Sequence, residues 1–197
     1  MSRKGAAGFD AFCRFAVDFL ADARVPYIVI GGLAVAVIGE PRMTADIDVV
    51  GFLTLDQADQ LIEAAERAGL EVASDERRRL RATGTLRFAK RGFVLDVILA
   101  SLPFEDTARK RARKRRLFER LVPLPTPEDL LVFKILAGRD KDLVDAVGIA
   151  RRHLRTLDRA YLLRTLREVC DLAEDGTALR LLEDVLAKAT PGPRRKR

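Results

Sequence analysis

The chain has 197 residues, of which 48% are hydrophobic, so it is long and apolar enough to bury a core. Its 36 lysines and arginines exceed its 29 acidic residues, and the formal net charge of +7 favours polyanionic partners, either nucleic acid or nucleotide phosphates. Disorder throughout is excluded, and so is a membrane span of about 20 residues, because the longest apolar run covers only residues 27–38.

The N-terminal segment and the cysteines bear on localisation. Charges at Asp10, Arg14 and Asp18 interrupt the stretch that a secretory signal would need to keep apolar, so we expect a helix there and a cytoplasmic protein. Cys13 and Cys170 lie far apart in helix-like patterns, which favours two buried thiols over a disulfide or a zinc site. A His-rich metal site is excluded, since the chain has a single histidine.

The first predicted elements are a helix, a strand and a second helix. Apolar residues recur at helical spacing over residues 9–23, and residues 27–30 then form a short apolar run typical of a buried strand. Gly31 and Gly32 interrupt this run, and residues 33–38 continue as an apolar helix that begins at the glycines. Further along we expect a β-rich segment at 46–50, Thr54 as the N-cap of a helix at 55–68, and strands at 86–89 and 93–99 joined by the turn 90–92.

From Phe104 onward the pattern predicts helix almost throughout, with prolines between residues 123 and 127 as the main interruption. The expected fold class is α+β, a mixed sheet flanked by helices and followed by a C-terminal helical bundle. We expect an α+β domain over residues 1–122, a helical part over 123–190 and a disordered basic tail over 191–197. The helices of the second part are predicted at 128–136, 141–154, 158–173 and 177–188.

Three carboxylates on predicted strands are the candidate catalytic and metal-binding residues. Asp46 and Asp48 are two residues apart, so a strand would turn both side chains to one face, where their repulsion favours a bound Mg²⁺ or Mn²⁺. Asp96 interrupts an apolar strand, where an unpaired charge would be costly, so something must neutralise it. If the two strands are neighbours, the three carboxylates could hold two metal ions for phosphoryl transfer. Two solvated aspartates on an exposed edge strand are the alternative for Asp46 and Asp48.

Gly31 and Gly32 supply a complementary feature, a turn without side chains at the start of a helix. Such a turn lets phosphate oxygens approach backbone N–H groups, although it could equally be an ordinary tight turn. A dinucleotide-binding loop is excluded because no third glycine follows at the required spacing. The glycines therefore indicate a phosphate-binding site beside the carboxylates.

These motifs together resemble the nucleotidyltransferase superfamily that includes DNA polymerase beta. The resemblance rests on Val29-Ile30-Gly31-Gly32-Leu33-Ala34 followed by Arg42-Met43-Thr44-Ala45-Asp46-Ile47-Asp48, with Asp96 as the third carboxylate on a later strand. The chain looks most similar to minimal bacterial members, the AbiEii-type toxins and the small antibiotic nucleotidyltransferases. The resemblance implies that Arg42 and Thr44 belong to the nucleotide-binding region. Gly32 stands where many active members have serine.

The resemblance extends to the helical segment that begins at Pro127. It implies that Lys134 contacts the triphosphate and that Asp142 or Asp145 matches a further acidic position on the next helix. Lys134 lies in an apolar helix, so a buried phosphate would explain its charge, and a lysine that extends to solvent is the alternative.

The expected function is transfer of a nucleoside monophosphate from a nucleoside triphosphate to an acceptor hydroxyl. Much of the basic excess lies in two patches, residues 77–81 and 109–120, and either could also be a solvated helix face. The second patch favours RNA, for example a tRNA end, as acceptor in a toxin-like role with a cognate antitoxin. The alternatives are a small-molecule acceptor, a nucleotide- or RNA-binding regulatory module, or an interaction protein that dimerises. The RNA-contacting residues would be Arg109, Lys110, Arg113, Lys114 and Arg116.

Overall fold

The computed structural model of this chain describes residues 3–190 and divides into two compact units. The first unit extends to Leu33 and resumes over Met43–Leu124, and the second comprises Ala34–Arg42 and the chain from Pro125 onward. The predicted tail, 191–197, lies outside the described residues.

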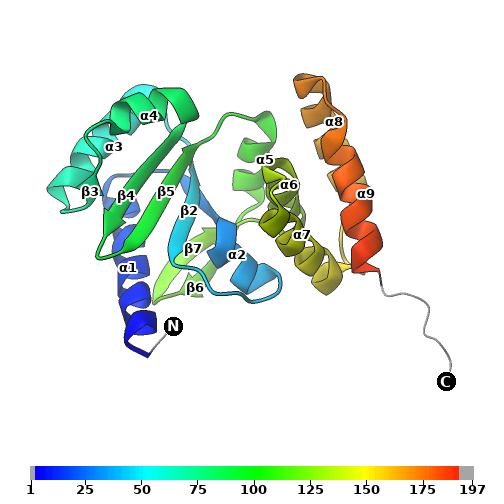
Figure 1. The fold of residues 1–197 in the computed structure, drawn as a ribbon, viewed down its shortest axis with the longest axis horizontal. Coiled ribbons are helices and arrows are strands. Elements are labelled where there is room, and N and C mark those ends of the chain that lie inside the picture. The colour runs from blue at the N-terminus through cyan, green and yellow to red at the C-terminus, as the bar shows by residue number, and fades with distance from the viewer. Residues whose placement is uncertain (1–2, 191–197) are drawn as a thin grey trace. The chain divides into compact units, whose positions relative to one another are not determined.

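A five-stranded mixed sheet with the strand order β1-β2-β5-β4-β3 forms the centre of the first unit (Figure 1). Strands β2 and β5 are parallel, whereas all other neighbours are antiparallel. The strands predicted at 27–30, 46–50, 86–89 and 93–99 are confirmed and share this sheet, as expected, whereas the short strand β3 was not predicted. Their bounds are Tyr27–Ile30 for β1, Asp46–Gly51 for β2, Glu71–Val72 for β3, Thr85–Lys90 for β4 and Phe93–Leu99 for β5.

Helices of different composition accompany the sheet. Thr54 caps one of them as predicted, because its hydroxyl accepts from the Gln57 backbone while the Gln57 side chain accepts from the Thr54 N–H. The basic patch at residues 77–81, for which a solvated helix face was the alternative to a polyanion-binding site, lies on a short helix after β3, α4. The helices of this unit are α1 (Arg3–Asp22), α3 (Leu55–Arg67), α4 (Glu76–Thr83) and α5 (Pro103–Arg111), and α2 (Gly31–Ile38) continues from the first unit into the second.

The two faces of the sheet differ in what covers them. Phe93 of β5 contacts Phe9 and Phe12 of α1, and Phe88 of β4 contacts Phe19 of the same helix. Because successive side chains on a strand alternate between faces, the odd-numbered positions of β5 and the even-numbered positions of β4 face α1. Asp96 therefore points to the opposite face.

The segment after α5 is a β-hairpin, so the predicted helix is wrong here. Strands β6 (Arg113–Leu117) and β7 (Arg120–Leu124) are joined by Phe118 and Glu119, whose φ angles of 50° and 62° are those of a two-residue hairpin turn. Neither residue is the glycine or asparagine that normally marks such a turn. Contacts with α1 hold the hairpin instead, since Phe118 packs edge-on against Phe9 and Arg120 pairs with Asp18.

The second unit is a helical bundle, as predicted, and the two parts together confirm the α+β class. The second unit also includes residues 34–42, which were predicted to belong to the α+β domain of residues 1–122. His153 Nε2 lies 2.7 Å from the Ile38 carbonyl oxygen, Arg152 donates to that of Gly39, and Arg151 pairs with Glu40. The helices are α6 (Pro127–Ala137), α7 (Asp140–His153), α8 (Arg159–Ala173) and α9 (Thr177–Ala189).

Both cysteines are free and buried, which confirms their predicted role as core thiols. Burial raises the pKa of Cys13 to about 12, so this thiol stays protonated at neutral pH. Within residues 3–190, none of the helices has the length and apolar character that a membrane crossing requires.

Candidate functional site

A row of charged residues crosses the middle of the sheet. Asp48 of β2 is paired in register with Asp96 of β5, and Asp96 is paired with Arg87 of β4. Residues directly opposite each other on neighbouring strands project from the same face, so these three side chains form one row. Asp46, two positions before Asp48, lies on this face too and is exposed. The structure thus brings the three predicted carboxylates together on the face opposite α1.

Arg87 is the residue that neutralises Asp96, and it belongs to none of the motifs recognised in the sequence. Its Nε donates to Asp96 Oδ1 at 2.8 Å and its Nη2 to Asp96 Oδ2 at 2.6 Å, so both carboxylate oxygens are engaged. Asp96 is 8% exposed, so it needs such a partner. The hydrogen bond with Asp96 is the main cause that raises the pKa of Arg87, and Asp46 and Asp48 add to it.

A signal for Arg87 does exist in the sequence. The hairpin of β4 and β5 turns at Arg91 and Gly92, with Lys90 opposite Phe93. Counting back three positions from Lys90 and forward three from Phe93 places Arg87 opposite Asp96. The register of a tight hairpin therefore indicates the pair once the turn is located.

Gly31, the first residue of the glycine turn, lies against the side chain of Asp48. It follows β1 directly and has a φ of +66°, a conformation that side chains disfavour. A Cβ atom placed on Gly31 would lie 1.9 Å from Asp48 Oδ2 and 2.7 Å from Asp48 Cβ. No other amino acid can occupy this position while Asp48 keeps its place. Gly32, the next residue, is buried in the first turn of α2.

Two of the three carboxylates have the donor chemistry that a divalent cation prefers. Asp46 is exposed and Asp48 half-buried, and their oxygens suit Mg²⁺ or Mn²⁺, which usually keep waters and phosphate oxygens as further ligands. Asp96, by contrast, directs both of its oxygens to Arg87. Among the described residues there is no cluster of three or more His, Cys, Asp or Glu side chains that could hold a metal ion.

Comparison with known proteins shows which fold the chain has. No protein-family model matches the sequence, and no curated protein matches it either. An antigenic nucleotidyltransferase-like protein from Paracoccidioides brasiliensis is similar in structure, with 17% identity and a TM-score of 0.51, over 91% of this chain and 92% of that one. A candidate nucleotidyltransferase from H. pylori has 14% identity and a TM-score of 0.51, over 96% of this chain and 94% of that one.

The chain has the nucleotidyltransferase fold. This confirms the predicted fold, and the predicted closeness to AbiEii-type toxins stays a prediction.

The second unit of this nucleotidyltransferase fold holds four of the other predicted nucleotide-binding residues, Arg42, Lys134, Asp142 and Asp145, in one ion-pair cluster. Lys134 is 5% exposed, and its Nζ lies 2.8 Å from Asp142 Oδ1 and 2.9 Å from Asp145 Oδ2. Arg42 binds Asp145 through two hydrogen bonds of 2.7 and 3.0 Å, and Arg139 pairs with Asp142. Carboxylates thus compensate the lysine charge that a buried phosphate was expected to balance.

Opposing effects act on the carboxyls of this cluster. Burial raises the pKa values of Asp142 and Asp145, but their cationic partners outweigh burial and bring both below the ordinary value. Asp142 is lowered by Arg139 and Lys134, and Asp145 by Arg42 and Lys134. Both aspartates therefore stay charged at neutral pH. The remaining predicted residue, Thr44, lies in the first unit, where its hydroxyl is 3.2 Å from the Asp46 carbonyl oxygen.

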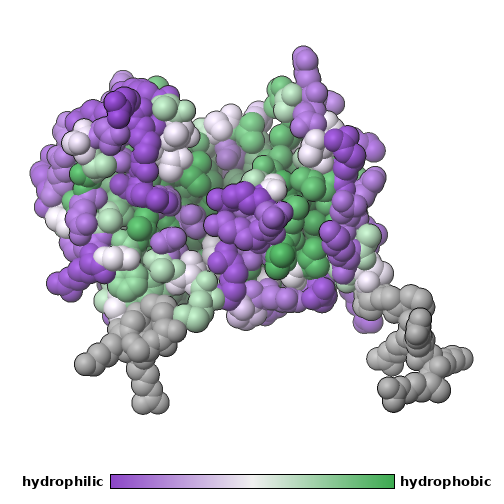
Figure 2. Space-filling view, viewed as in Figure 1, coloured by the Kyte–Doolittle hydropathy of each residue, from purple (hydrophilic) through white to green (hydrophobic). Residues whose placement is uncertain are grey.

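The two basic patches have different surroundings. The arginines at 77–81 lie on α4 and pair with acidic residues of α3 and of the start of α4, and hydrophilic side chains gather over both helices (Figure 2). In the second patch, Arg109 and Lys110 pair with Asp106. The four consecutive basic residues of β6, Arg113, Lys114, Arg115 and Arg116, are all exposed on a strand instead of a helix.

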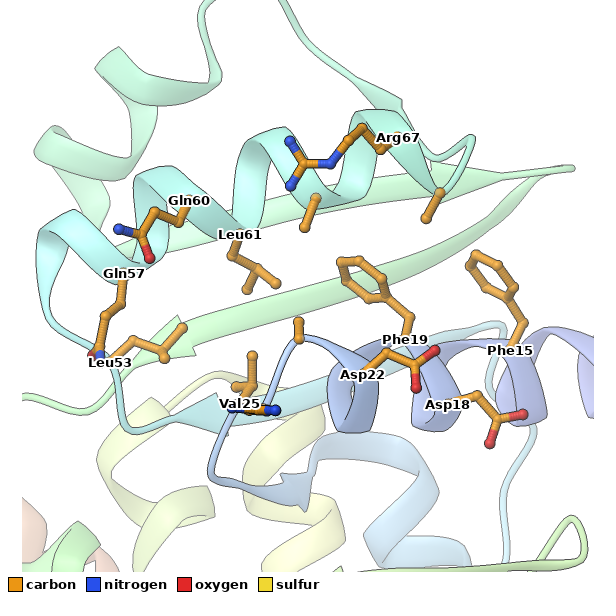
Figure 3. Close-up of a pocket in the computed structure, with 14 residues that line it drawn as sticks. Phe15, Asp18, Phe19, Asp22, Val25, Leu53, Gln57, Gln60, Leu61 and Arg67 are labelled. Carbon is orange, nitrogen blue, oxygen red and sulfur yellow. The ribbon is translucent and has the colours of Figure 1, made fainter.

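A cavity of about 650 Å³ lies between α1 and α3 (Figure 3). Phe15 and Phe19 of α1 and Leu61 of α3 point into it, and Gln57 and Arg67 of α3 lie near its edge. None of the predicted site residues lines it. Since α1 covers the face opposite Asp96, this cavity is separate from the row of carboxylates.

Proposed function

We propose that this protein is a metal-dependent nucleotidyltransferase that transfers a nucleoside monophosphate from a nucleoside triphosphate to an acceptor hydroxyl. The observation that carries the proposal is the contact between Gly31 and Asp48. The glycine at the start of α2 and a carboxylate on the neighbouring strand lie so close together that any side chain on Gly31 would collide with Asp48. A phosphate bound at the turn would therefore lie beside the carboxylates that favour a divalent cation.

In the proposed reaction, the oxygen of the acceptor hydroxyl attacks the α-phosphorus of the nucleoside triphosphate. The bond from that phosphorus to the oxygen that bridges to the β-phosphate breaks, and pyrophosphate leaves with the bonding electrons. The hydroxyl proton passes to a carboxylate of the row or to water. Asp46 and Asp48 would hold Mg²⁺, which in such reactions neutralises phosphate charge and polarises the reacting oxygens. The N–H groups at the start of α2 would bind phosphate oxygens.

We propose RNA, such as a tRNA end, as the acceptor, in a cytoplasmic toxin-like role with a cognate antitoxin. The support is the run of exposed basic residues on β6, because four adjacent cations attract a phosphate backbone. A small-molecule acceptor would make no use of this strand. The salt dependence of labelling distinguishes an RNA acceptor from a small-molecule acceptor. Labelling that depends on contacts with RNA phosphates falls steeply as the salt concentration rises.

The test is incubation of the protein with each α-³²P-labelled nucleoside triphosphate, Mg²⁺ and total bacterial RNA. The Asp48→Asn variant should lose labelling, whereas Asp171→Asn, a matched change at an exposed position of α8, should retain it. Label on RNA with the unmodified protein and with Asp171→Asn, but not with Asp48→Asn, would support the proposal and identify both base and acceptor. Absence of label with every nucleotide, while nucleotide still binds, would favour a binding module or a small-molecule acceptor.

A further inference from the structure

Asp96, the third carboxylate of the candidate site, is already paired with a cationic side chain in the structure. Both of its oxygens accept hydrogen bonds from Arg87 on the adjacent strand. We propose that Arg87 takes the place of a second metal ion, so that the site binds one divalent cation at Asp46 and Asp48 and uses Asp96 to position Arg87. This inference rests on the proposed nucleotidyl transfer and specifies how its charges are arranged.

The backbone holds Arg87 at this position. Arg87 is paired directly with Asp96 in the sheet, so its side chain starts from the same row whatever rotamer it adopts. Its backbone N–H also donates to Glu76 Oε1 at 2.5 Å, and Glu76 is a buried residue of α4 that pairs with Arg79. A second metal ion at Asp96 would have to displace two charge-assisted hydrogen bonds and would then lie near the displaced cation.

Arg87 also has spare capacity to bind a ligand. A guanidinium group has five N–H donors, of which the two hydrogen bonds to Asp96 use two. The Arg87 side chain is 54% exposed, whereas that of Asp96 is 11% exposed. The carboxylate is thus the fixed, buried part of the pair and the arginine faces solvent. The geometry suits Asp96 as a positioning residue and Arg87 as the group that contacts triphosphate or the leaving pyrophosphate.

The test is a titration with Mn²⁺ alone, followed by electron paramagnetic resonance of the free ion to obtain the number of ions bound per chain. The unmodified protein should bind one ion, and Asp48→Asn should bind none. Asp96→Asn should still bind one. Arg87→Gln should bind two, because Asp96 is released as a ligand. Arg91→Gln, an exposed arginine in the turn of the same hairpin, is the matched control and should bind one.

Two Mn²⁺ ions on the unmodified protein, falling to one in Asp96→Asn, would overturn the inference, because Arg87 would then simply move aside. That result would leave the proposed function standing. A single ion in a folded Arg87→Gln protein would overturn the inference as well. If Arg87→Gln does not fold, the comparison of Asp96→Asn with the unmodified protein still decides the question. Absence of Mn²⁺ binding to the unmodified protein would count against the inference and the proposed metal dependence together.

Discussion

Replacing Gly31 by alanine should damage both stability and metal binding, and Gly84 provides a matched control. Both glycines have a φ of +66°, so alanine meets the same backbone penalty at each, about 1 kcal/mol. A Cβ on Gly84 would have nothing within 4 Å, whereas one on Gly31 would lie 2.7 Å from Asp48 Cβ. Rotating the Asp48 side chain cannot relieve that contact, so the backbone must move, at an additional cost of about 2 kcal/mol.

Urea unfolding and Mn²⁺ titration measure the two effects. Gly84→Ala should lower the free energy of unfolding by about 1 kcal/mol and leave Mn²⁺ affinity unchanged. Gly31→Ala should lower it by about 3 kcal/mol and weaken Mn²⁺ binding by about 10-fold to 100-fold, because Asp48 is displaced. Equal stability and equal Mn²⁺ affinity of the two variants would show that Gly31 does not make room for a metal-binding Asp48.

Three further predictions concern the ion-pair cluster and the hairpin. Lys134→Met should lower the free energy of unfolding by about 3 kcal/mol in urea, because it removes the shared partner of Asp142 and Asp145; a loss below about 1 kcal/mol would contradict this. The pKa values of Asp142 and Asp145 are lowered in the folded protein, so their ion pairs stabilise the fold at pH values above the ordinary carboxyl pKa of about 4. This stabilisation is lost as the pH falls through the lower pKa values of the folded state. The urea midpoint should therefore drop in acid, and a midpoint unchanged down to pH of about 2 would oppose the assignment. Glu119→Gly should raise the melting temperature by roughly 2–4 °C, since glycine adopts the φ of 62° without strain, and a lower melting temperature would refute that.

Most elements of the fold could be predicted because their signals are local. The apolar run at residues 27–30 is followed at once by a glycine pair, and Thr54 has Gln57 three residues later to complete a capping box. The β6–β7 hairpin was missed for the opposite reason. Its turn uses Phe118 and Glu119, and contacts with Phe9 and Asp18, about one hundred residues earlier, hold the hairpin.

The candidate site, too, could be predicted from the sequence only where the signals are local. That Asp46 and Asp48 share a face follows from their spacing, because side chains on a strand alternate with a period of two residues. The alternation likewise puts Asp96 on one face of its strand, but which carboxylate lies beside it depends on the order of strands in the sheet. The pairing of Arg42 with Asp145 spans 103 positions and has no local signal at all.

The sequence by itself determined the residue types and the faces they occupy: a glycine turn, two carboxylates two positions apart, and a third within an apolar strand. The tertiary structure decided which oppositely charged group neutralises each buried charge. Asp96 is held by Arg87, and Lys134 by Asp142 and Asp145, where the sequence had suggested a metal ion and a phosphate. The physical reason is that a buried charge must have a partner, but only the pairing of strands and the packing of helices determine which oppositely charged group lies within reach.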